Sequence, residues 1–135
     1  MKRVLFLCSG NSCRSQIAQA IVNHYLPGEW LVFSAGTRPT GYIHPLVFQV
    51  LQEIGINHTG SSKSLDEFRN QHFDLVITVC DDAKENCPLW LGDGNKQHIG
   101  FPDPAVAEGN SEQILMVFRD VRDQIIDKIL KNLAA

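Results

Sequence analysis

Short apolar runs of strand length alternate along this chain with longer stretches of helical period. The apolar runs cover residues 4–7, 31–33 and 75–79, and a weaker one follows at 98–100. Uninterrupted apolar runs are typical of parallel strands that are buried on both faces, and the helical stretches between them supply the crossovers. The alternation predicts an α/β fold with about four parallel strands flanked by helices on both faces.

Three stretches have the apolar spacing of amphipathic helices. The first begins near Ser12, and the second runs from Pro45 to a stop at Gly55. Proline suits the first turn of a helix and glycine suits its end. The third stretch, residues 114–133, is the longest and carries apolar residues at every third or fourth position.

Composition excludes several classes of partner. Twelve Lys and Arg residues against fifteen Asp and Glu residues give a net charge of −3, a poor match to nucleic acid or to an anionic membrane surface. The apolar run at residues 4–8 is too short for a signal-peptide core or a membrane span. We therefore expect a single cytoplasmic domain over residues 1–135 with no nucleic-acid or membrane partner, and the charge balance and small size favour a monomer.

The polar segment after the first apolar run has the pattern Cys-x5-Arg-Ser and spans Cys8 to Ser15. It falls beyond the carboxyl end of a strand, where open parallel sheets bind their ligands. Its small residues allow backbone N–H groups to face inward, and the following helix N-terminus adds partial positive charge. The Arg14 guanidinium can hold two oxygens of a tetrahedral anion. We expect an anion cradle formed by Ser9, Gly10, Asn11, Ser12, Cys13 and Arg14.

Cys8 is expected at the bottom of this cradle. A helix N-terminus and cationic neighbours favour the thiolate form of a cysteine, and the Ser15 hydroxyl can donate a hydrogen bond to the sulfur. A thiolate beneath a bound oxyanion predicts nucleophilic attack on the central atom of phosphate or arsenate. The segment lacks the glycine and lysine patterns of nucleotide-binding loops.

Expulsion of an oxygen from the attacked anion calls for a general acid. The best candidate is Asp103, which lies between Pro102 and Pro104. The two prolines stiffen the segment that carries the carboxyl group. Because Asp-Pro alone is an ordinary turn signal, this assignment depends on the Cys8 segment.

A second pair of cysteines, Cys80 and Cys87, follows the third apolar run. Cys80 is therefore expected at the same sheet edge as Cys8. Residues 82–85 have the form of a capping box and predict a short helix between the two cysteines. A helical rise of about 1.5 Å per residue would separate their Cα atoms by roughly 10 Å, beyond the ~7 Å limit of a disulfide. Joining Cys80 to Cys87 thus requires this helix to unwind.

The segment from Cys8 to Ser15 resembles the active-site loop of the low-molecular-weight protein tyrosine phosphatase superfamily, which includes the thioredoxin-coupled arsenate reductases. Gln16 resembles the reductases, since the phosphatases commonly have proline there. Ser34-Ala35-Gly36 fits both branches. The phosphatases typically carry an aromatic residue after Asp-Pro, whereas this chain has Ala105, which argues against a phosphotyrosine substrate.

The resemblance implies a redox cycle that uses no bound organic cofactor and no metal. Cys8 attacks arsenate while Asp103 protonates the leaving oxygen. Cys80 then attacks the sulfur of Cys8, which releases arsenite. Finally Cys87 attacks Cys80, and thioredoxin reduces the Cys80–Cys87 disulfide. A simple phosphatase needs neither Cys80 nor Cys87.

Two other functions remain open at this point. One is a low-molecular-weight phosphatase that hydrolyses phosphate monoesters through a Cys8 phosphocysteine and whose extra cysteines only guard Cys8 against oxidation. The other is a non-catalytic thiol module that captures arsenite or a soft metal. The cysteine spacings are looser than those of structural zinc sites, and we expect the Cys13 side chain to point into the packing. The histidines have no metal-binding spacing and are expected to be surface or packing residues: His24, His44, His58, His72 and His98.

Overall fold

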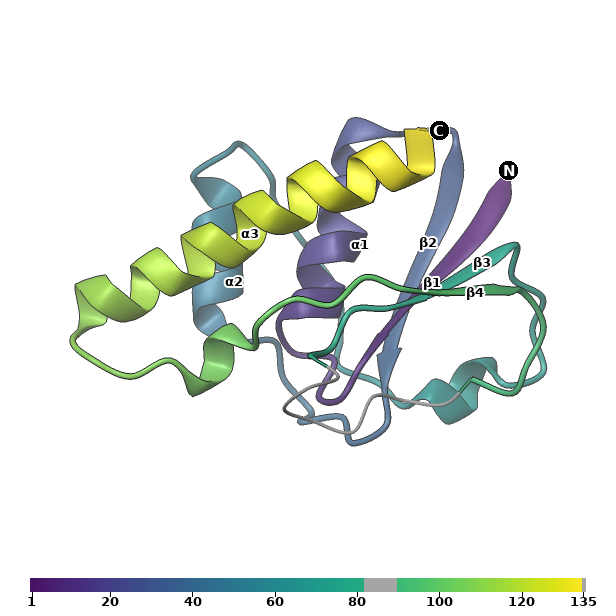
Figure 1. The fold of residues 1–135 in the computed structure, drawn as a ribbon, viewed down its shortest axis with the longest axis horizontal. Helices are drawn as coiled ribbons and strands as arrows, with labels where there is room; N and C mark the ends of the chain where they lie inside the picture. The colour runs from purple at the N-terminus through teal and green to yellow at the C-terminus, as the bar shows by residue number, and fades with distance from the viewer. Residues whose placement is uncertain (82–89, 135) are drawn as a thin grey trace.

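The computed structural model describes residues 1–81 and 90–134 (Figure 1). In chain order the elements are β1 (Lys2–Cys8), α1 (Arg14–Tyr25), β2 (Trp30–Gly36), α2 (Pro45–Gln52), the 3-10 helix η1 (Leu65–Phe68), β3 (Leu75–Thr78), β4 (Asn95–His98), the 3-10 helix η2 (Pro104–Val106) and α3 (Ser111–Ala134).

The strands form one parallel sheet in the order β2-β1-β3-β4, which confirms the predicted four-stranded parallel sheet. The fourth strand was expected at residues 98–100, but β4 covers Asn95–His98. Its four side chains are all exposed, because β4 is an edge strand that is defined by its backbone pairing with β3. An apolar pattern cannot detect a strand of this kind.

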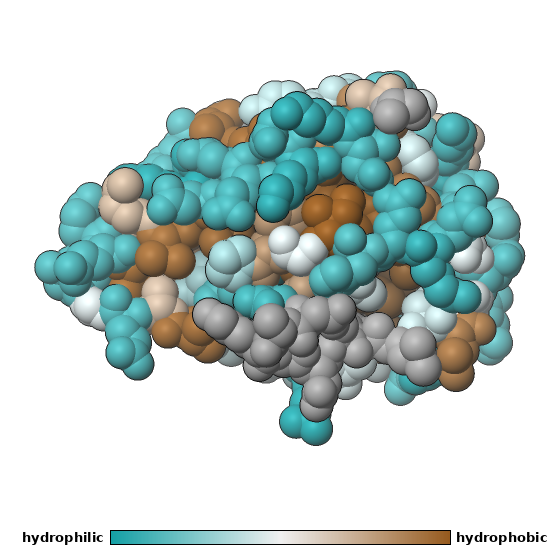
Figure 2. All heavy atoms as spheres, in the orientation of Figure 1, coloured by the Kyte–Doolittle hydropathy of each residue, from teal (hydrophilic) through white to brown (hydrophobic). Residues whose placement is uncertain are grey.

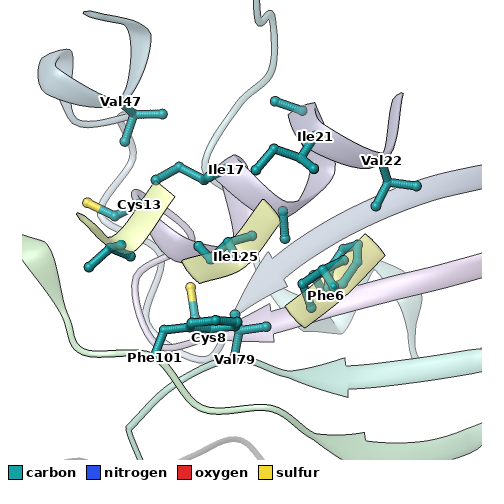
Figure 3. Packing of buried hydrophobic residues seen from close by; sticks show 14 of the residues in the cluster. Phe6, Cys8, Cys13, Ile17, Ile21, Val22, Val47, Val79, Phe101 and Ile125 are labelled. Carbon is teal, nitrogen blue, oxygen red and sulfur yellow. The ribbon is translucent and has the colours of Figure 1, made fainter. Parts of the chain in front are cut away.

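Alternate side chains of β1 enter two separate cores. Val4, Phe6 and Cys8 belong to the larger core, whereas Leu5 and Leu7 belong to the smaller one. This follows from the two-residue period of a strand and explains why the run is apolar throughout. Figure 3 shows Phe6 and Cys8 pointing from β1 toward the side chains of the helices. The nucleophile candidate therefore lies on the helix-covered face of the sheet.

The three predicted α-helices are confirmed, and within the described residues all three pack into the larger core. The opposite face is covered by the 3-10 helix η1, whose Leu65 and Phe68 pack with Phe73 and Trp90. Helices were expected on both faces; among residues 1–81 and 90–134, the second face carries this short helix alone, and a cluster of aromatic rings packs against the sheet there.

The long helix α3 packs across α1 and α2 (Figure 1). It is joined to the end of α2 through Glu53, which receives ion pairs from Arg119 at 2.7 Å and from the buried Arg122 at 2.8 Å. Figure 2 shows that hydrophilic residues dominate the outer side of α3. Among the described helices, none combines the length and the apolar character that a membrane crossing requires.

Candidate active site

The loop between β1 and α1 lies at the carboxyl edge of the sheet, as expected. Three of its carbonyl oxygens accept hydrogen bonds from the segment that follows β2: Ser9 O from Arg38 N at 2.9 Å, Gly10 O from Thr40 N at 3.1 Å, and Ser12 O from His44 N at 3.1 Å. These carbonyl groups are hydrogen-bonded to the neighbouring segment and point toward it. The N–H groups of the loop are therefore available to face a bound anion.

Gly36 allows β2 to run close to this loop. A Cβ atom at Gly36 would lie 2.3 Å from the carbonyl oxygen of Ser9, closer than any side chain tolerates. Gly36 also pairs with Cys8 in the sheet. The glycine of the Ser34-Ala35-Gly36 motif is therefore required by the close approach of two backbones.

A chain of buried side chains leads from Asn11 to the sulfur of Cys8. Asn11 has a positive φ of 48°, a conformation that asparagine tolerates better than most residues. Its Nδ2 donates to Ser15 Oγ at 2.8 Å, and Ser15 Oγ lies 2.9 Å from Cys8 Sγ. An amide nitrogen can only donate, so the hydroxyl oxygen accepts from Asn11 and its hydrogen is available to Cys8. The Ser15 hydroxyl is thereby oriented to donate a hydrogen bond to the Cys8 sulfur.

Arg14 and Asp103 meet beside the loop. The Arg14 side chain is 3% exposed; its Nη1 donates to Phe101 O at 3.2 Å, and its Nη2 lies 3.7 Å from Asp103 Oδ2. Asp103 is 31% exposed, and its Oδ1 accepts the N–H of Ala105 at 3.0 Å, which caps η2. The capping bond and Pro104 hold the carboxyl group near Arg14.

These residues surround a cavity of about 110 Å³. It is lined by Cys8, Ser9, Gly10, Ser12, Cys13, Arg14, Thr40, Tyr42, His44, Asp103 and Ala105. A water molecule occupies about 30 Å³ of liquid, and sites for drug-sized ligands begin at roughly 300 Å³. The cavity is therefore large enough for a small oxyanion.

Cys13 is 4% exposed and belongs to the larger core, as the sequence predicted for its side chain. Burial, followed by the nearby charge of Asp103, raises the pKa of the Cys13 thiol to about 12. Figure 3 shows the Cys13 sulfur pointing away from the Cys8 sulfur. Its thiol stays protonated at neutral pH, so it is a poor nucleophile.

Cys80 follows β3 and is completely buried at the same edge of the sheet as Cys8, where Val79 N donates to Leu7 O at 2.9 Å. Cys80 is disulfide-bonded, whereas Cys8 and Cys13 carry free thiols, so neither of them is its partner. Cys87 and the helix predicted from the capping box at residues 82–85 lie outside the described residues.

Sequence reasoning missed several residues that build the site. Thr40, Tyr42 and His44 line the cavity, although His44 was expected to be only a surface or packing residue. Lys63 was expected to be a solvated lysine, yet its backbone N–H donates to Asn11 Oδ1 at 2.9 Å. The sequence could have indicated Thr40, Tyr42 and His44, because the residues that follow β2 reach the same carboxyl edge of the sheet as Cys8.

Gln16 connects the loop to a more distant segment. Its Nε2 donates to Asn11 O at 3.1 Å and to Ser61 O at 2.9 Å, and its Oε1 contacts His58 Nε2 at 2.8 Å. Gln16 therefore braces the loop from the first turn of α1. Within residues 1–81 and 90–134, no three His, Cys, Asp or Glu side chains gather where they could hold a metal ion.

Comparison with known families and curated proteins gives matches over nearly the whole chain. The family described as low molecular weight phosphotyrosine protein phosphatase matches residues 3–135. An arsenate reductase from Shouchella clausii is 43% identical over 133 residues, which cover 96% of this chain and 94% of the relative.

Two solved structures extend the comparison. One, an arsenate reductase in the phosphate binding state, superimposes with a TM-score of 0.79 at 29% identity and covers 99% of this chain and 98% of its own. The other, a thioredoxin-dependent arsenate reductase from Corynebacterium glutamicum, gives a TM-score of 0.67 at 31% identity; the match covers 99% of this chain and 62% of that one.

Proposed function

This chain belongs to the low-molecular-weight phosphotyrosine protein phosphatase family, and we propose that within this family it is a thioredoxin-coupled arsenate reductase. The observation that carries the proposal is the pairing of two sulfur sites at one sheet edge. Cys8 is a free thiol beneath an oxyanion-sized cavity, and Cys80 next to the neighbouring strand is disulfide-bonded. Hydrolysis of a phosphate ester would use only the first site, whereas the reduction of arsenate uses both.

The first step is attack on arsenate. The Cys8 thiolate forms a bond to arsenic, and one As–O bond breaks. Asp103 protonates the departing oxygen, which leaves as water. Arg14 and the N–H groups of the loop neutralise the charge on the remaining oxygens. Asp103 lies 3.7 Å from Arg14, which supports both roles at one anion.

The second step is electron transfer through sulfur. The Cys80 thiolate attacks Cys8 Sγ, an S–S bond forms, and the S–As bond breaks with its electron pair on arsenic. Arsenic(V) thereby becomes arsenic(III), which leaves as arsenite. Cys87 next attacks Cys80 and frees Cys8, so the oxidation ends in a Cys80–Cys87 disulfide that thioredoxin reduces. A free Cys8 together with a disulfide-bonded Cys80 is the combination expected when the relay has run.

Coupling to thioredoxin also indicates the cellular compartment in which the protein would act. A relay that ends in a disulfide needs a compartment with a supply of reduced thioredoxin, and the cytoplasm provides one. We therefore infer a cytoplasmic location.

The experiment follows NADPH oxidation by thioredoxin and thioredoxin reductase after arsenate is added. Wild type should turn over, whereas Cys80→Ser and Cys87→Ser should lose at least roughly 100-fold, because the relay cannot be completed. Hydrolysis of a small aryl phosphate serves as the internal control. It needs only Cys8, Arg14 and Asp103, so it should change little in the two variants.

Equal arsenate-dependent rates in the three proteins would refute the relay. Arsenite binding in a fixed ratio without arsenate-dependent NADPH consumption would identify the chain as a thiol-capture module instead. Turnover with glutaredoxin and glutathione but not with thioredoxin would support the arsenate chemistry and refute thioredoxin as the reductant.

A further inference from the structure

His44 holds an unusual position at the edge of the catalytic cavity. It is the N-cap residue of α2, and its backbone N–H donates to Ser12 O of the anion loop at 3.1 Å. Its half-buried side chain lines the same cavity as Cys8 and Asp103. The residue is therefore attached to the anion loop through its backbone and also contributes to the wall of the cavity where the substrate would bind.

Hydrogen bonding fixes the tautomer of the His44 ring. Nδ1 accepts the backbone N–H of Leu46 at 3.2 Å, and an accepting nitrogen carries no proton. In the neutral ring the proton must then lie on Nε2. The ring also packs against Phe118, with 4.7 Å between ring centroids, which holds its orientation. One defined N–H donor remains on the edge of the ring opposite the α2 cap.

The charge state of the His44 ring suits a hydrogen-bond donor. Burial lowers the pKa of His44 below its ordinary value, while the nearby charge of Asp103 acts in the opposite direction. A neutral ring donates to an oxyanion without forming an ion pair with Asp103, so the carboxyl group keeps its place next to Arg14. The cation of the site remains Arg14.

We infer that His44 is a further substrate-binding residue, whose Nε2–H donates to an oxygen of the bound arsenate from the wall of the cavity that follows β2. This inference rests on the proposed arsenate reductase function for the identity of the anion. His44 would give the tetrahedral anion a hydrogen-bond donor from outside the Cys8–Ser15 loop. This role also explains why a histidine, rather than a shorter capping residue, stands at the start of α2.

Two substitutions separate the cap from the donor. In His44→Asn the side-chain oxygen occupies the position of Nδ1 and retains the cap, since asparagine is a favoured N-cap residue, but no donor reaches the cavity. In His44→Gln the amide nitrogen occupies the position of Nε2 and retains the donor, whereas the cap is weakened. The Asn variant should therefore keep its melting temperature, and the Gln variant should lose several degrees.

The test measures the binding of inorganic phosphate to the reduced protein by calorimetry, together with KM and kcat for arsenate. We expect His44→Asn to raise the phosphate Kd and the arsenate KM roughly 10-fold, the loss of one hydrogen bond to a charged group, with kcat within about twofold. His44→Gln should stay within about twofold of wild type in phosphate Kd.

A wild-type phosphate Kd in His44→Asn would overturn the assignment. Equal weakening in both variants would also overturn it, because that result would indicate a structural role for the ring. Phosphate binding requires no turnover, so the assignment is separable from the proposed function. A second pair of results separates the two: the wild type fails to reduce arsenate, while His44→Asn still binds phosphate less tightly than the wild type. That pair of results would refute the reductase proposal and leave His44 assigned as an oxyanion ligand.

Discussion

Replacement of Ser15 by alanine removes the hydroxyl group that lies between Asn11 and Cys8. Ser15 Oγ is 2.9 Å from Cys8 Sγ and accepts from Asn11 Nδ2 at 2.8 Å, and all three residues are buried. A hydrogen bond to a charged group contributes about 1.5–3 kcal/mol, which is equivalent to a factor of roughly 10 to 100. The sulfur of Cys8 should become correspondingly less reactive in Ser15→Ala.

The assay is the rate at which iodoacetamide alkylates Cys8 in the reduced protein at pH 7, with mass spectrometry to separate its label from those on the other cysteines. Ser15→Ala should react at least roughly 10-fold more slowly than wild type. The variant should also lose about 1–3 kcal/mol in its free energy of unfolding, because Asn11 Nδ2 is left as a buried donor without its acceptor.

Ser34→Ala is the matched control. Ser34 is also completely buried, and its hydroxyl donates to Gln19 Oε1 at 2.6 Å, outside the chain of bonds that leads to Cys8. This variant should lose a comparable amount of stability and keep the alkylation rate of Cys8 within about twofold of wild type. The reasoning fails if Ser15→Ala reacts as fast as wild type, and equally if both variants slow by the same factor.

Two further predictions concern the α2–α3 junction and Asp103, the proposed general acid. Glu53→Gln should lower the free energy of unfolding in urea at pH 7 by about 1–3 kcal/mol, since it weakens the contacts to Arg119 and to the buried Arg122. Hydrogen bonds from Arg119 first, and from Arg122, hold the pKa of Glu53 below its ordinary value. The stabilisation is therefore present above the unfolded pKa of about 4.3 and is lost as the pH falls through the lower folded value. The stabilities of the variant and the wild type should converge as the pH falls through that range, and a difference that stays constant throughout acid titration would contradict this. Asp103→Asn should reduce kcat for arsenate roughly 100-fold or more while phosphate still binds, and an unchanged kcat in stopped-flow or steady-state assays would remove Asp103 as the acid.

The segment from Cys8 to Ser15 was predictable because its parts are close in the sequence. Cys8 ends β1, and Arg14 and Ser15 begin α1, so only a short loop separates them, and local patterns of apolar and small residues mark these elements. The edge position of Cys80 followed from the same logic, since parallel strands end at a common edge. The buried position of the Cys13 side chain followed from its place one turn beyond Cys8.

The sequence by itself thus determined the parallel sheet, the three α-helices and the loop that surrounds the Cys8 sulfur. Only the tertiary structure decided which distant side chains complete that loop: Lys63 bonds to Asn11 across 52 positions, and His44 reaches the cavity from the start of α2. It also decided that the polar residues of β4 form a strand. The physical reason is that periodicity reports which face of an element is buried, whereas contacts between elements depend on where each crossover returns the chain.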